Sequence, residues 1–340
     1  MVLMHFSPTR LTIPLAAALG AMALTGCGTD SDEAAADGTL QVAAAFYPLE
    51  FVASRVGGDR VEVTTLTGPG TEPHDIELTV AQTALVGEAD LVLYQDSIQP
   101  IVGDAVEQTA DGATLEVEEV IDFIPFAEEH DHSEDDHSED DHSDDDHSDD
   151  DHSDDEHSDD EEGHDHGDED PHFWLDPARM ATLAQAVASE LGDIDPDHAE
   201  EYDTNAAVLV EELDELDAAF AEGLADCERD VVVVSHDAFG YLGDRYGLDI
   251  HGIAGLSPDA EPGPADIAEL QELIDAEGVT TVFSETLVSP ATAETLAQDA
   301  GVGTDVLDPL EGLSDETADE DYLSIMRSNL ASLQEANGCQ

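Results

Sequence analysis

The feature that most constrains the fold is an alternation of short apolar runs with stretches of helical periodicity, which begins at Leu40. Short apolar runs are typical of buried strands, and strands that alternate with helices indicate β-α units around mainly parallel sheets. The strands expected from this pattern are 40–45, 61–66, 91–94, 231–234, 248–253, 279–283 and 305–307. The helices expected with them are 49–56, 80–86, 177–191, 239–246, 264–277, 290–300 and 319–335.

A longer helix, residues 198–225, is expected between the two groups of β-α units. Its apolar residues recur at spacings of three and four, and acidic residues cover the opposite face. The apolar stripe consists of Leu209, Leu213, Leu216, Phe220 and Leu224. We therefore predict an α/β protein with an N-terminal lobe over 40–194, a rigid linking helix over 195–225 and a C-terminal lobe over 226–340.

Residues 128–170 consist only of acidic residues, serine, histidine and glycine, and much of the segment repeats the unit Asp-His-Ser-acid-acid. A segment without apolar residues cannot bury a core, so the sequence predicts disorder here. Imidazoles beside carboxylates favour loose binding of divalent ions; the alternative is a solvated acidic segment that happens to contain histidine. The candidate low-affinity metal ligands are His130, His132, His137, His142, His147, His152, His157, His164 and His166.

The charge balance excludes one class of partner. The chain has 85 Asp and Glu residues against 7 Lys and Arg residues, and its formal net charge is -78. Binding to nucleic acid depends on basic side chains that replace counterions, so no nucleic-acid partner is expected. A strongly negative protein instead attracts cations.

The N-terminus resembles a bacterial lipoprotein signal. Arg10 precedes an apolar run, 11–24, that is too short to span a bilayer, and Leu24-Thr25-Gly26-Cys27 follows. We expect a signal peptide over 1–26, a lipid on the Cys27 thiol, a tether over 27–39, and a location at the outer face of the cell membrane. The alternative is a plain secretory signal with an incidental cysteine.

The two remaining cysteines are Cys227 and Cys339. An even pair in an exported protein favours a disulfide, which here would join the last helix to the C-terminal lobe. Two unpaired buried thiols are the alternative.

Four ionisable side chains follow the ends of predicted strands or the acidic segment: His74, His172, His236 and Glu285. The carboxyl ends of parallel strands are where α/β proteins place ligands. Three imidazoles and one carboxylate suit four-coordinate zinc. Asp75 and Asp237 stand next to proposed ligands, either as acceptors that orient an imidazole or as helix caps.

Several motifs resemble one family, the bacterial zinc and manganese solute-binding proteins of ATP-driven metal importers. They are FYPL at 46–49, PGTEPHDIE at 69–77, DPHFWLDP at 170–177, VSHDAFGYL at 234–242, GLSPDAEP at 255–262, and Glu285 with the VSP that follows. The resemblance covers the chain from about Leu40 onward, apart from the acidic segment. Where relatives often have Asn-Gly-Leu and Glu, this chain has Gln95-Asp96-Ser97-Ile98-Gln99-Pro100. The rim of the N-terminal lobe is therefore expected to differ.

The resemblance implies two lobes bridged by a long helix, with one metal ion in the cleft held by His74, His172, His236 and Glu285. It also implies a monomeric, non-enzymatic zinc receptor that delivers Zn²⁺ to the permease of an ABC importer. Three alternatives stay open: a manganese receptor, an extracellular zinc store or adhesin, and a zinc hydrolase with water as a fourth ligand. The three-histidine set and the histidine-rich segment favour the zinc branch of the family.

Overall fold

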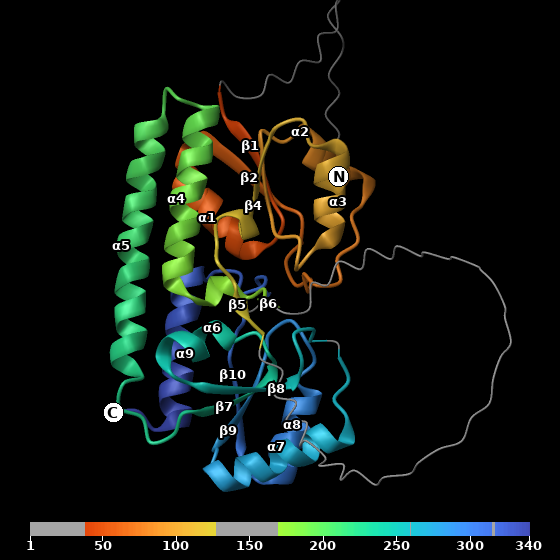
Figure 1. The fold of residues 1–340 in the computed structure, drawn as a ribbon, viewed down its shortest axis with the longest axis vertical. Helices are drawn as coiled ribbons and strands as arrows, with labels where there is room; N and C mark the ends of the chain where they lie inside the picture. The colour runs from red at the N-terminus through yellow and green to blue at the C-terminus, as the bar shows by residue number, and fades with distance from the viewer. Residues whose placement is uncertain (1–37, 127–168, 259, 315–316) are drawn as a thin grey trace, which may run out of the picture. The chain divides into compact units, whose positions relative to one another are not determined.

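Two four-stranded parallel sheets organise the residues that the structure describes, which are 38–126, 169–258, 260–314 and 317–340 (Figure 1). The structure is a computed structural model. The predicted signal peptide over 1–26, lipid attachment at Cys27 and the metal-binding histidines from His130 to His166 all lie outside the described residues.

The first sheet has the strand order β2-β1-β3-β4, and all neighbouring strands are parallel. Its strands are β1 (Leu40–Ala44), β2 (Val61–Thr65), β3 (Leu91–Tyr94) and β4 (Ala113–Glu116). The helices between them are α1 (Tyr47–Gly57), α2 (Val80–Glu88) and α3 (Pro100–Thr109). The sequence pattern does not predict α3 and β4, because Gly103 interrupts the helical pattern and Ala113–Glu116 is half polar.

The second sheet has the order β10-β9-β7-β8, again entirely parallel. Its strands are β7 (Val231–His236), β8 (Asp249–Ala254), β9 (Thr281–Ser284) and β10 (Gly303–Val306). The helices are α6 (Gly240–Tyr246), α7 (Pro264–Glu277), α8 (Ala291–Ala300) and α9 (Tyr322–Asn337). The two sheets confirm the predicted parallel α/β class.

The antiparallel neighbours α4 (Pro177–Ile194) and α5 (Ala199–Gly223) pack together; α4 lies beside the first sheet, and α5 runs alongside both (Figure 1). The predicted apolar stripe from Leu209 to Leu224 is buried. Helix α5 contacts α1, in the first half of the fold (the first sheet and its helices), and α9, in the second half (the second sheet and its helices). The helix therefore bridges the two halves as predicted. Residues from Gly38 onward form one compact unit, so the lobe boundaries at 194 and 225 stay predictions.

Several short elements lie between the larger ones. Strands β5 (Ile124–Pro125) and β6 (Glu169–Asp170) pair antiparallel, and the 3-10 helices are η1 (Gly58–Arg60), η2 (Val117–Glu119) and η3 (Phe173–Leu175). Glu169 and Asp170, which the sequence analysis included in the disordered segment, form β6 instead; residues 128–168 of that segment lie outside the described residues. In the part of the chain that the structure describes, no helix is long and apolar enough to cross a membrane.

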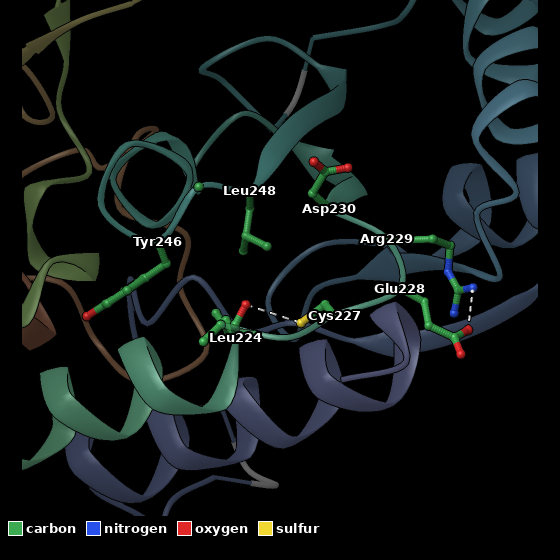
Figure 2. Close-up of a pocket in the computed structure, with 9 residues that line it drawn as sticks. Leu224, Cys227, Glu228, Arg229, Asp230, Tyr246 and Leu248 are labelled. Atoms are coloured by element: carbon green, nitrogen blue, oxygen red, sulfur yellow. Dashed lines mark hydrogen bonds and ion pairs between the residues drawn. The ribbon is translucent and has the colours of Figure 1, made fainter. Parts of the chain in front are cut away.

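Cys227 and Cys339 form the predicted disulfide, which joins residues 112 apart in the sequence. Cys227 lies between α5 and β7, and Cys339 lies two residues after the end of α9, so the bond fastens the last helix to the segment that leads into the second sheet. A surface pocket of about 330 Å³ lies beside Cys227 (Figure 2). Among its charged residues, Arg229 pairs with Glu228 and donates to the carbonyl of Ala336.

Candidate metal site

Four side chains converge from both halves of the chain: His74, His172, His236 and Glu311. His74 lies in the loop between β2 and α2, and His172 stands between β6 and η3. His236 is the last residue of β7, and Glu311 follows β10. One nitrogen or oxygen of each lies within 4.8 Å of those of the others. The structure thus brings all three predicted histidines together.

The spacing of these atoms matches one small ion. Oε1 of Glu311 lies 3.4 Å from Nε2 of His74, 3.4 Å from Nε2 of His172 and 3.2 Å from Nε2 of His236. In a tetrahedral site with metal–ligand bonds near 2.0–2.1 Å, the ligand atoms are about 3.3 Å apart. The three distances from Glu311 are therefore those of a tetrahedral zinc site, and the nitrogen atoms lie within 4.8 Å of one another.

The converging atoms make no hydrogen bonds to other described groups. Nε2 of each of the three histidines and Oε1 of Glu311 are buried, and none has a hydrogen-bond partner among the described residues. Buried polar groups are normally satisfied, and leaving several unsatisfied in one place costs stability. A cation at the centre would satisfy all four at once. His74 is the only partly exposed member, with 14% of its side chain accessible, while the others are buried.

Glu285, the carboxylate expected from the sequence, occupies a different place. It follows β9 directly, and its Oε1 lies 2.7 Å from Nδ1 of His236, on the opposite side of the ring from Glu311. The reason is strand order, because β7 and β9 are neighbours in the sheet and their carboxyl ends meet. Glu285 therefore orients His236, and Glu311 stands where Glu285 was expected.

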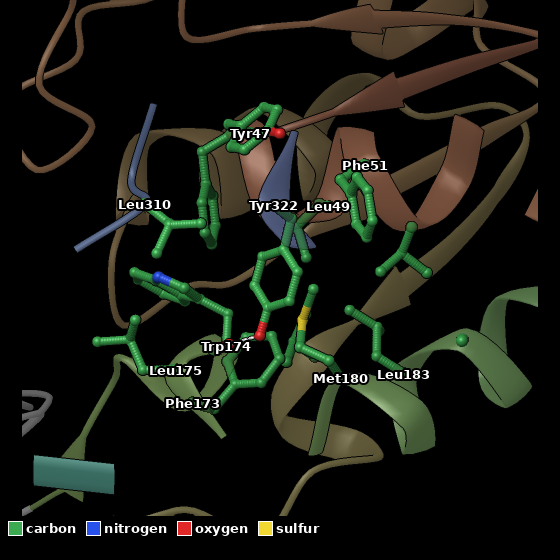
Figure 3. Packing of buried hydrophobic residues seen from close by; sticks show 14 of the residues in the cluster. Tyr47, Leu49, Phe51, Phe173, Trp174, Leu175, Met180, Leu183, Leu310 and Tyr322 are labelled. Atoms are coloured by element: carbon green, nitrogen blue, oxygen red, sulfur yellow. Dashed lines mark hydrogen bonds between the residues drawn. The ribbon is translucent and has the colours of Figure 1, made fainter. Parts of the chain in front are cut away.

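Glu311 reaches the cluster on a tightly held turn. Leu310 has φ 58, a left-handed conformation, and its N–H donates to Oδ1 of Asp308 at 2.8 Å. Asn329 of α9 brackets Asp308 with two hydrogen bonds to its backbone, at 2.9 and 2.7 Å. The Trp174 indole donates to the carbonyl of Pro309 at 2.7 Å. Figure 3 shows Leu310 packed beside Trp174 in the buried core.

Sequence reasoning missed Glu311, although a signal was present. The strand expected over 305–307 is followed by Asp-Pro-Leu-Glu, so the rule that identified His236 also applies to this acidic residue.

A second clustered histidine, His172, also has a carboxylate partner on its other ring nitrogen. Nδ1 of His172 lies 2.8 Å from Oδ1 of Asp170. Such a partner fixes the tautomer that presents Nε2 to a metal. Among the described residues, no hydrogen bond joins Asp75 or Asp237 to an imidazole; Asp170 and Glu285 have the role considered for them.

Opposite charges determine the ionisation of His236 and Glu311. Burial opposes protonation of His236, but its bond with Glu285 and the nearby Glu311 outweigh burial and raise the pKa of His236 to about 10. Burial would raise the pKa of Glu311, yet the three imidazoles around it hold that pKa well below the usual value. Without a cation, the site therefore holds an ionised carboxylate and a protonated His236, and a metal ion must displace that proton.

Comparison with known proteins places this geometry in a family. Residues 42–336 match the ZnuA family, described as zinc-uptake complex component A, periplasmic. The chain is 36% identical over 332 residues to the zinc-binding lipoprotein AdcA of Streptococcus pneumoniae, a match that covers 94% of this chain and 60% of AdcA. The chain thus spans about 60% of the length of that relative.

Two further comparisons cover nearly the whole length of the protein compared. The high-affinity zinc uptake system protein ZnuA of Bacillus subtilis is 32% identical over 321 residues, with 92% of this chain and 93% of ZnuA covered. The crystal structure of the Zn(II)-bound ZnuA-like domain of S. pneumoniae AdcA superimposes with a TM-score of 0.67 at 32% identity. That match covers 88% of this chain and 99% of the domain.

Proposed function

Since the chain belongs to the ZnuA family of periplasmic zinc-uptake components, we propose that it is the extracytoplasmic receptor that captures Zn²⁺ for an ATP-driven importer. The observation that carries the proposal is the convergence of three unpartnered imidazole nitrogens on one unpartnered carboxylate oxygen, at 3.2 to 3.4 Å. The metal ion is cargo, and His74, His172, His236 and Glu311 are its proposed ligands.

The donor set favours zinc over manganese. Imidazole nitrogen suits borderline ions such as zinc, whereas manganese prefers carboxylate and other oxygen ligands. Three of the four converging atoms are imidazole nitrogens, and only one is an oxygen. We therefore expect Zn²⁺ to displace Mn²⁺ from the site at comparable concentrations.

The same set favours a receptor over a zinc hydrolase. A catalytic zinc keeps one position open for water. Here Glu311 supplies a fourth donor atom at tetrahedral spacing, and a closed coordination sphere holds an ion without activating water. The absence of a catalytic role is therefore part of the proposal.

The placement of the ligands suits capture and release. His74 and His172 belong to the first half of the chain, and His236 and Glu311 to the second. An ion bound by all four joins the halves, so separation of the halves at the permease would release it. A lipid on Cys27, which is the residue type that such anchors require, would hold the receptor at the outer face of the membrane beside that permease.

The histidine-rich residues 130–166 have a separate proposed role as a weak collector of zinc. Their imidazoles stand among carboxylates, which raises imidazole pKa values and makes zinc compete with protons. We expect several weak sites in this segment, each weaker at pH 6 than at pH 8.

Metal titration of the protein produced without residues 1–26 tests both roles. The intact protein should bind one Zn²⁺ tightly and several weakly, and deletion of residues 130–166 should remove only the weak sites. His172→Ala, which removes a buried cluster member, should lower the tight affinity by at least about tenfold. His198→Ala, on a histidine outside the cluster, is the matched control. Unchanged tight binding in His172→Ala would overturn the proposal.

A further inference from the structure

Two of the four clustered ligands end the same tripeptide, in which an acidic residue is followed by proline and histidine. These are Glu72-Pro73-His74 and Asp170-Pro171-His172. In each, the histidine N–H donates to the carboxylate two residues earlier, at 3.0 Å to Oε2 of Glu72 and 2.9 Å to Oδ1 of Asp170. The N–H side of each Pro-His peptide is therefore held by its own tripeptide.

The carbonyl side of each Pro-His peptide is held by a glutamine from elsewhere. Nε2 of Gln99 donates to the carbonyl of Pro73 at 3.0 Å, and Nε2 of Gln95 donates to the carbonyl of Pro171 at 2.8 Å. Both glutamines belong to the single turn that connects β3 to α3. This is the segment, 95–100, in which the sequence departs from the pattern of the family it resembles.

The orientation of both amides is determined by their surroundings. A proline carbonyl can only accept, so a reversed amide would place two oxygens together. Gln99 also donates to Oγ1 of Thr67 at 2.7 Å, and that hydroxyl donates to the carbonyl of Ala45. Gln95 donates to Oγ of Ser97 at 3.0 Å.

Burial of both glutamine side chains also lowers the stability of the fold. Their side chains are buried, with 0% and 1% of each residue exposed, and Oε1 of each has no hydrogen-bond partner among the described residues. A buried amide oxygen without a partner lowers stability, so such groups call for an explanation. The explanation that the geometry offers is the use of each NH₂ group on a peptide next to a ligand.

Clamping a peptide at both its C=O and its N–H fixes the plane from which the next side chain departs. His74 and His172 are the residues that follow the two clamped groups, and their rings lie 5.5 Å apart between centroids. Metal sites need ligands held within about 0.5 Å of their bonding positions, which depends on the residues that support them.

We infer that Gln95 and Gln99 are positioning residues for the metal, which preset His172 and His74 as one two-imidazole half-site through the Pro171 and Pro73 carbonyls. The inference rests on the proposed zinc-capture function, which it deepens. Because both glutamines lie on one turn, the two histidines keep their mutual spacing whether or not His236 and Glu311 are engaged.

The test replaces each glutamine by methionine, which has a similar length and no donor. Gln99→Met and Gln95→Met should each weaken Zn²⁺ binding by about 10–100-fold and accelerate its release. They should also shift the visible absorption of bound Co²⁺, which reports the geometry of the ligands. Gln82→Met is the matched control, since Nε2 of Gln82 donates to the carbonyl of Leu66, which is not next to a ligand. It should leave the Co²⁺ spectrum unchanged even if the melting temperature falls.

A second arm assigns each glutamine to its histidine. In a His74→Ala background, Gln99→Met should have no further effect on Co²⁺ binding, whereas Gln95→Met should keep its effect. Where a methionine variant fails to fold, Gln→Asn at the same position serves, because its amide is one methylene too short to reach the carbonyl.

The outcomes separate the inference from the proposed function. If the unaltered protein binds neither Zn²⁺ nor Co²⁺ tightly, the proposed function fails. If it binds one ion tightly and both glutamine variants keep its affinity, release rate and Co²⁺ spectrum, the inference alone is overturned. Weaker binding in both variants with an altered Co²⁺ spectrum, and with neither change in Gln82→Met, supports it.

Discussion

Nδ1 of His236 lies 2.7 Å from Oε1 of Glu285, on the side of the ring that faces away from the ligand cluster. The other ring nitrogen, Nε2, faces Glu311 at 3.2 Å. One imidazole therefore separates two carboxylates that serve different purposes. Glu285 orients the ring, and Glu311 stands at a ligand position.

This separation predicts different consequences for the same substitution. Glu285→Gln should weaken Zn²⁺ binding by about 10–100-fold, as loss of an orienting partner does, and keep the number of ligands. Glu311→Gln should weaken it by about a further order of magnitude, because a charged ligand is lost. Competition titration measures the affinities, and X-ray absorption of the bound zinc counts the ligands. A larger loss in Glu285→Gln than in Glu311→Gln would contradict the assignment.

Zinc binding should release protons at neutral pH. The pKa of His236 is raised to about 10 in the metal-free site, so the imidazole is protonated there and must lose its proton to bind. Apparent affinity should increase by roughly one order of magnitude per pH unit between pH 7 and 9. Calorimetry in buffers of different ionisation enthalpy measures the protons released. Binding that releases no proton at pH 7 would show that His236 is already neutral.

The raised pKa of His236 also predicts how the stability of the metal-free protein depends on pH. A raised imidazole pKa stabilises the fold fully below the unfolded value near 6.5, and this contribution is lost as pH rises towards about 10. The metal-free melting temperature should therefore fall from pH 7 to pH 9. His236→Gln should remove that part of the decline. An identical decline in the variant would assign it to other groups.

The left-handed conformation of Leu310 predicts an unusual order of stability. Leu310→Ala and Leu310→Gly both remove the buried side chain, but only glycine adopts φ 58 without strain. The glycine variant should be the more stable of the two by about 1 kcal/mol. At Leu213, within helix α5, the order should reverse by about the same amount. Denaturant unfolding of all four variants measures both differences; the same order at both positions would contradict the prediction.

The disulfide predicts a loss of stability when it is removed. Replacing Cys227 and Cys339 together by serine should lower the free energy of unfolding by about 2–5 kcal/mol, because the long loop between them is no longer closed. Chemical unfolding with and without reductant measures the effect. Reductant should destabilise the unaltered protein and leave the double variant unchanged. A double variant as stable as the unaltered protein would mean that the bond does not constrain the unfolded chain.

The local pattern of apolar and polar residues was sufficient to predict most of the strands and the buried face of α5. Short apolar runs predicted seven of the eight strands in the two four-stranded sheets, and a period of 3.6 residues predicted the buried stripe from Leu209 to Leu224. The pattern was insufficient at α3, where Gly103 weakens the helical signal, and at β4, whose residues are half polar. Those two elements form because β3 supplies an edge for β4 and α2 packs against α3.

The sequence by itself determined the class of fold, the cysteine pair and three of the four clustered residues. Each of those histidines sits in a motif whose chemistry can be recognised where it stands. Only the tertiary structure decided between Glu285 and Glu311, since the order β10-β9-β7-β8 turns Glu285 towards the outer nitrogen of His236. It alone also placed Gln95 and Gln99 on the peptides before His172 and His74. The physical reason is that strand order and long-range hydrogen bonds depend on the packing of the whole chain, which no local pattern records.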